Sequence, residues 1–83
     1  MEREDVLERT MAFVCRNFIV DRGDFALDQS LIDQGIIDSF GLVELSGFMQ
    51  SEFGMAISES DMNRANFGSI YKMVDFILSR SSA

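Results

Sequence analysis

Asp38 and Ser39 are the one pairing in this sequence whose residue types and position suggest chemistry. They follow the apolar residues Ile36 and Ile37 and precede Phe40. Aspartate and serine both begin helices well, because their side-chain oxygens accept a hydrogen bond from the free N–H groups of the first turn. Those N–H groups also favour an attached phosphate. The pair is therefore either an ordinary helix cap or a hydroxyl placed to carry a phosphate ester, and spacing alone does not decide between them.

The other reactive residue types exclude the common catalytic sites. The 83 residues contain no His and one Cys. Imidazole bases, His metal sites, CxxC pairs and intrachain disulfides are therefore absent, and Ser39 has no partner for hydrolase chemistry. Cys15 lies in an apolar helical segment, where a free Cys usually acts as a small core residue. The segment from Asp21 to Asp28 lacks the glycine and glutamate positions of an EF-hand. We expect no catalytic residue and no metal site.

The negative charge is concentrated in the middle of the chain. The formal net charge is -7, and no Lys or Arg occurs from Gly23 to Asn63. That stretch holds all of the following acids: Asp24, Asp28, Asp33, Asp38, Glu44, Glu52, Glu59 and Asp61. Such a surface repels nucleic acid, so we expect no nucleic-acid partner and a basic surface on any protein that docks there.

Apolar spacing predicts the two helices nearest this pair. The first runs from about Arg3 to Val20, with Gly23 as a stop, and its apolar stripe is Leu7, Met11, Val14 and Phe18. The second begins at Asp38 or Ser39 and ends at Gly54, with an inner stripe of Leu42, Leu45, Met49 and Phe53. Between them, Asp21 to Asp38 has no helical period but is apolar enough to form an ordered loop packed on the helices.

Two further helices are expected after Gly54. Ser58 and Asp61 form an Asp variant of the capping box, which predicts a short helix over about Glu59 to Ala65. A last helix, capped near Gly68 or Ser69, follows from the spacing of Ile70, Met73, Val74, Ile77 and Leu78. The tail from Ser79 to Ala83 is expected to fray.

These elements predict an all-α fold, a small four-helix bundle of three longer helices and one short helix, with a long loop between the first two. Residues 1–83 form a single domain with an ordered core of about residues 3–79, and we expect a free-standing monomer. No run of 18 uncharged apolar residues is present, so no membrane span is expected. The lone Cys and the charged N-terminus indicate the cytoplasm.

The second helix is predicted to expose apolar groups on its outer face. Phe40, Val43 and Gly47 fall together there, with Glu44 beside them. Solvent alone does not favour such a surface, which is typical of a protein-docking site. With Asp38 at the helix start, these are the predicted partner-docking residues.

The motif around Ser39 resembles that of the acyl and peptidyl carrier proteins, small acidic four-helix domains modified with 4'-phosphopantetheine on the Ser of an Asp-Ser-Leu motif. Asp38-Ser39-Phe40 stands at that motif. The lead-in from Leu31 to Ile37, the segment Leu42 to Leu45 with Glu52-Phe53-Gly54, and Asn66 to Ile70 also resemble the family, over about Leu31 to Ile77.

The resemblance implies a carrier, not an enzyme. Ser39 would receive 4'-phosphopantetheine from coenzyme A through a phosphopantetheinyl transferase. The loaded arm would hold an acyl or aminoacyl group as a thioester between a loading ligase, adenylating enzyme or synthase and an acceptor enzyme. Two departures stand out: Phe40 replaces the usual Leu, and Gly41, Gln50 and Ser51 stand where fatty-acid carriers often have acids. The second favours an aminoacyl, peptidyl or specialised acyl carrier.

Two other functions remain open on the sequence. A non-catalytic helical adaptor would bind one protein through Phe40 and Val43, with Ser39 an inert cap. Acid–base catalysis by the carboxylates would require activity of the isolated domain without coenzyme A. The adaptor keeps its function in Ser39→Ala, whereas a carrier loses it completely while remaining folded, because a helix cap contributes only about 1 kcal/mol.

Overall fold

The computed structural model describes residues 2–81, and in that range the regular structure is entirely helical. The elements in chain order are α1 (Arg3–Phe18), η1 (Arg22–Asp24), α2 (Ser39–Phe53), η2 (Glu59–Asp61), α3 (Arg64–Phe67) and α4 (Ile70–Ser81), where η1 and η2 are single 3₁₀ turns. This confirms the predicted all-α bundle with three longer helices, one short helix and a long connection between the first two. Every described helix is too short or too polar to cross a membrane.

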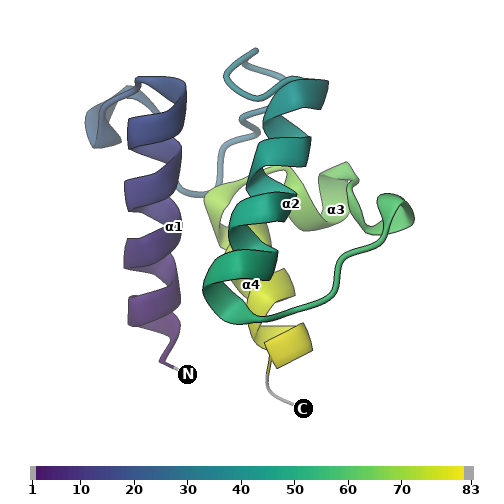
Figure 1. Ribbon diagram of the computed structural model, residues 1–83. Coiled ribbons are helices and arrows are strands. Elements are labelled where there is room, and N and C mark those ends of the chain that lie inside the picture. The colour runs from purple at the N-terminus through teal and green to yellow at the C-terminus, as the bar shows by residue number, and fades with distance from the viewer. Residues whose placement is uncertain (1, 82–83) are drawn as a thin grey trace.

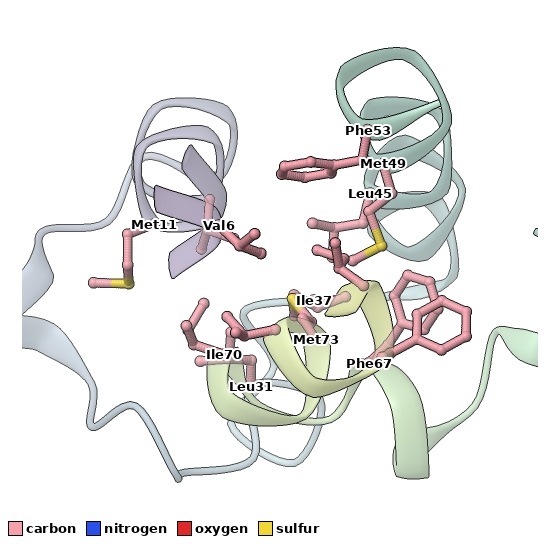
Figure 2. Packing of buried hydrophobic residues seen from close by; sticks show 14 of the residues in the cluster. Val6, Met11, Leu31, Ile37, Leu45, Met49, Phe53, Phe67, Ile70 and Met73 are labelled. Atoms are coloured by element: carbon pink, nitrogen blue, oxygen red, sulfur yellow. The ribbon is translucent and has the colours of Figure 1, made fainter. Parts of the chain in front are cut away.

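Helices α1 and α2 lie side by side in opposite directions, so the end of α1 and the start of α2 meet at the same end of the molecule (Figure 1). Helix α4 is the central element, because it packs against α1, α2 and α3. Side chains of Val6 from α1, Leu45 and Met49 from α2, and Met73 from α4 point into one common interior (Figure 2). The bundle is thus held by one shared core.

The long connection between α1 and α2 is ordered, as predicted. Phe25, Leu31 and Ile37 are buried in the core, and the N–H of Leu31 donates to the carbonyl of Gly68 at 2.8 Å. Apolar side chains therefore fix a segment that has little helix of its own. This segment ends at Asp38, the residue that begins α2.

Helix α1 ends at Phe18, the last residue of its apolar stripe and within a turn of the predicted Val20, but Gly23 is not its stop. The last helical residue is Phe18, and Ile19 follows in the left-handed conformation, with φ 56° and ψ 53°. The N–H of Val20 reaches back to the carbonyl of Cys15 at 3.2 Å, which closes the helix end. Gly23 lies instead within η1. A left-handed β-branched residue is strained by about 1–2 kcal/mol, because its Cβ approaches a carbonyl oxygen.

The prediction of one short helix over Glu59 to Ala65 is wrong in detail. The Ser58 capping box forms, since the Ser58 N–H donates to Asp61 Oδ2 at 2.9 Å, but it closes only the single turn η2. Asn63 is extended and caps the new helix α3, with its side chain accepting from the Asn66 N–H at 3.0 Å. Ser58 and Asn63 each cap a separate turn, so the segment forms η2 and α3 in place of one helix.

Helix α4 also runs further than expected. It continues through Ser81, so Ser79 and Arg80 lie in regular helix, and only Ser82 and Ala83 of the tail expected to fray lie outside the described residues. Arg80 explains the extension. Its guanidinium makes two hydrogen bonds to the Asp61 carboxylate, at 2.7 and 3.1 Å, and lies 4.9 Å from the centre of the Phe76 ring.

Candidate functional site

Asp38 is the N-cap of α2, and Ser39 is the first helical residue. Asp38 has extended backbone angles, and its Oδ1 accepts from the Gly41 N–H at 2.9 Å. Of the two candidate caps, the aspartate takes the capping position. Because the cap uses one carboxylate oxygen of Asp38, the hydroxyl of Ser39 is not needed to start the helix.

The Ser39 side chain is exposed and has no hydrogen-bond partner among residues 2–81. The backbone N–H groups of Ser39 and Phe40 also find no acceptor within that range, whereas those of Gly41 and Leu42 bond to Asp38. Free N–H groups and the positive end of a fifteen-residue helix favour a phosphate on the neighbouring oxygen. The residues present therefore fit a phosphodiester on Ser39, and the N–H groups of Ser39 and Phe40 are the groups that would meet its charge.

The outer face of α2 exposes large apolar side chains next to this hydroxyl. Phe40 is 78% exposed and Val43 is 60% exposed. Gly47 lies on the same face with open space where a Cβ would be. The helix thus presents the three predicted apolar docking residues together, and we call Phe40, Val43 and Gly47 the α2 surface.

Glu44 is also exposed, but it is directed toward α1. Its Oε2 accepts from the Asn17 side-chain amide at 2.7 Å. Glu44 therefore lies at the border between the α2 surface and α1. One of its carboxylate oxygens is therefore hydrogen-bonded to a neutral group.

A contact between α1 and the first turn of α2 was not anticipated from the sequence. A Cβ built on Gly41 would lie 2.8 Å from Cε1 of Phe18, so the ring occupies the space that a side chain at position 41 needs. Phe18 belongs to an aromatic group along the seam, in which the Phe13 and Phe48 rings stack with centroids 4.3 Å apart. The signal for this contact is the glycine itself, since an isolated Gly inside a helix often marks a close approach.

Two ion pairs outside the Ser39 turn shift the pKa of their carboxylates. Hydrogen bonds from Arg80, and then from the backbone and side chain of Ser58, lower the pKa of Asp61 to about 2. Arg22 likewise lowers the pKa of Glu8 by hydrogen bonding and charge. Within residues 2–81, no three His, Cys, Asp or Glu residues are grouped to hold a metal ion. Cys15 is partly buried against the core, in agreement with a packing role.

Comparison with known proteins gives one consistent result. A family model described as phosphopantetheine attachment site matches residues 9–77, which include Asp38 and Ser39. The chain is similar to the D-alanyl carrier protein of Streptococcus thermophilus, with 30% identity over 86% of this chain and 89% of that protein.

Two further relatives support the same family. One is the D-alanyl carrier protein of Streptococcus suis, with 27% identity over 89% of this chain and 92% of that protein. The other is the acyl carrier protein of Petrotoga mobilis, with 28% identity over 77% of this chain and 75% of that protein. These matches do not favour the helical adaptor. The family model covers most of the bundle, including the turn that exposes the Ser39 hydroxyl, and the chain belongs to the family of phosphopantetheine-bearing carrier proteins.

Proposed function

We propose that Ser39 is the attachment site of 4'-phosphopantetheine and that residues 1–83 act as one carrier domain. The observation that carries this proposal is the exposed Ser39 hydroxyl, which has no partner among the described residues and lies at the start of α2 behind the Asp38 cap. A hydroxyl that neither caps the helix nor supports the core is free for modification. Its substitution therefore separates function from stability.

In the modification, Ser39 Oγ forms a new bond to the phosphorus that carries the pantetheine arm in coenzyme A. The P–O bond to adenosine 3',5'-bisphosphate breaks, and a base of the phosphopantetheinyl transferase takes the hydroxyl proton. The free N–H groups of Ser39 and Phe40 then face the new phosphodiester. The terminal thiol of the bound arm supplies the thioester linkage for the cargo.

The cargo class that we favour is an aminoacyl group, with a peptidyl or specialised acyl group as the alternative. Two observations support it. Most of the relatives described above are named D-alanyl carrier proteins. This chain also lacks acids at Gly41, Gln50 and Ser51. The proposed partners are the transferase, a loading ligase, adenylating enzyme or synthase, and an acceptor enzyme.

The surface that partners would dock on combines the α2 surface with two carboxylates. Phe40 and Val43 supply apolar contact area, Gly47 lets a partner approach α2 closely, and Asp38 and Glu44 would meet basic side chains. A small interface with a charged rim suits a carrier that is bound and released repeatedly. The proposed carrier works as a monomer in the cytoplasm, where the reducing environment keeps a single Cys as a free thiol.

The test is the intact mass of the chain before and after incubation with coenzyme A and a broad-specificity phosphopantetheinyl transferase. We expect the wild type to gain the mass of one phosphopantetheine and Ser39→Ala to gain none, with the circular dichroism of the two proteins unchanged. A matched control is Ser51→Ala, an exposed serine on α2 outside the proposed surface, which should be modified like the wild type. Modification of Ser39→Ala, or none of the wild type beside a working carrier, would refute the proposal.

A further inference from the structure

Ile19 combines two unfavourable features that packing within the bundle does not explain. It adopts a positive φ of 56°, the only one at a non-glycine residue among those described. Its side chain is also 89% exposed, more than any other large hydrophobic residue in residues 2–81. Glycine or asparagine at this helix end would avoid both the strain and the exposed apolar area. An outlier of this kind is a reason to look for a function in contact with another molecule.

The position of Ile19 links it to the start of α2. It directly follows Phe18, whose ring packs on the backbone of Gly41, and Asn17 donates to Glu44. Because α1 and α2 run in opposite directions, the end of α1 and the start of α2 lie at the same end of the bundle (Figure 1). Ile19 directly follows α1, and Ser39 is the first residue of α2. A molecule that reaches the hydroxyl of Ser39 from this end would also meet the end of α1.

We infer that Ile19 extends the α2 surface onto the end of α1 and that the two are covered together by the phosphopantetheinyl transferase that modifies Ser39. The inference rests on the proposed function, since it names the partner that uses the same site. An enzyme that transfers a group to Ser39 Oγ must bring its reaction centre to the first residue of α2. Phe40, next to Ser39 on α2, and Ile19, at the end of α1, are then exposed apolar side chains at this end of the bundle.

Charge complementarity favours this occupant. Coenzyme A carries a pyrophosphate and a 3'-phosphate, so an enzyme that binds it needs Arg or Lys around its reaction centre. The end of this bundle offers the carboxylates of Asp38 and Glu44, and Asp21 and Asp24 follow Ile19 in the chain.

The two arginines nearby leave this end acidic. Arg22 is paired with Glu8, with Nη2 and Oε2 2.8 Å apart. Arg16, in the last turn of α1, is the other of these two positive charges, and the four carboxylates named above outnumber it. A basic rim around the transferase site would thus meet Asp38 and Glu44 beside the α2 surface, and Asp21 and Asp24 close to Ile19 in the chain.

The test is the kcat/KM of the transferase reaction with Ile19→Asn. Asparagine tolerates the left-handed conformation, so we expect this variant to be at least as stable as the wild type in urea unfolding. Its kcat/KM should nevertheless fall about tenfold, through KM, because an apolar contact is lost. Ile19→Leu restores the apolar side chain and should recover most of the rate. Stability and rate therefore move in opposite directions, which a purely structural role for Ile19 would not produce.

Tyr71→Asn is the matched control. Tyr71 is also an exposed large hydrophobic residue, at 41%, but its ring lies 5.8 Å from Arg3 Cζ, beside the other end of α1. Its kcat/KM should equal that of the wild type. Equal rates for Ile19→Asn and wild type would overturn this inference and leave Ser39 as the attachment site. Absence of modification on the wild type would overturn both.

Discussion

The ring of Phe18 stands where a side chain at position 41 would have to lie, with Cε1 only 2.8 Å from the Cβ position of Gly41. The glycine is buried in the first turn of α2, two residues after Ser39. The end of α1 and the start of α2 therefore fit together only while residue 41 has no side chain. This contact fixes the turn that carries the candidate hydroxyl.

The first prediction compares Gly41→Ala with Gly47→Ala on the same helix. Alanine is favoured over glycine in a helix by about 1 kcal/mol, and nothing lies within 4 Å of a Cβ at Gly47. Gly47→Ala should therefore be stabilising by about that amount. At Gly41, displacing the Phe18 ring costs about 1–3 kcal/mol, which offsets or exceeds the gain, so the variant should be no more stable than the wild type. Urea unfolding measures both, and equal stabilisation of the two variants would show that the ring moves freely.

The second prediction concerns the Thr10 hydroxyl. Thr10 is fully buried on α1, and its Oγ1 has no hydrogen-bond partner in the described part of the chain. Thr10→Val keeps the shape and removes the buried polar group, so it should raise the free energy of unfolding by about 1 kcal/mol. Thr10→Ser keeps the hydroxyl and loses a methyl group, so this variant should lower the free energy of unfolding by a similar amount. Destabilisation by valine would mean that the hydroxyl is satisfied in solution.

The third prediction separates the two roles assigned to Asp38. Asp38→Ala removes the acceptor for the Gly41 N–H and should cost about 1 kcal/mol of stability. Asp38→Asn keeps an oxygen at that position and should change stability by only a few tenths of a kcal/mol. Both variants lose the negative charge, so both should lower kcat/KM of the transferase reaction to a similar extent. A rate loss confined to the alanine variant would assign the whole effect to helix capping.

The fourth prediction is a pH dependence located at Asp61. Its pKa of about 2 in the folded protein lies below the ordinary value of 3.8, chiefly because of the hydrogen bonds from Arg80. A lowered folded pKa means that the pair stabilises the protein above pH 3.8 and that this contribution is lost as the pH falls toward 2. In Arg80→Gln the pKa of Asp61 should rise toward its ordinary value.

NMR titration of the Asp61 carboxyl carbon measures this shift directly. Arg16→Gln is the control, because Arg16 lies on α1 and is not the partner of Asp61. Its titration curve should match that of the wild type. An unchanged curve in Arg80→Gln would assign the low pKa to Ser58 instead.

Sequence periodicity located each long helix because each carries an apolar stripe that packs on the core, although α2 is apolar on its outer face as well. Leu45, Met49, Met73 and Ile77 are buried as predicted, whereas Leu42 and Leu78 of the same stripes are half-buried. The apolar stripe of α1 does not predict the burial of Val6 and Thr10. Helix α1 packs against both α2 and α4, so it buries a wider face than a stripe of four residues indicates. Helix ends were harder to predict, since Ile19 takes a conformation that its residue type disfavours.

The sequence predicts the part of the candidate site that lies within one helix start, but it does not predict the residues that α1 contributes. Asp38, Ser39 and Phe40 are neighbours in sequence, so capping and exposure follow from one helix start. The contributions of Asn17, Phe18 and Ile19 depend on how α1 packs against α2, across about twenty residues of loop, and no local pattern encodes that packing. Only the glycine at position 41 hinted at it.

The left-handed Ile19 has a consequence for protein engineering. A library selected for thermal stability alone would replace it with glycine or asparagine, since either relieves the backbone. Such a variant would look improved in every unfolding assay. If the end of α1 serves a partner, the same selection would erase that contact without any sign in the folded protein, so stabilised versions of this domain need to be screened for turnover as well as for melting temperature.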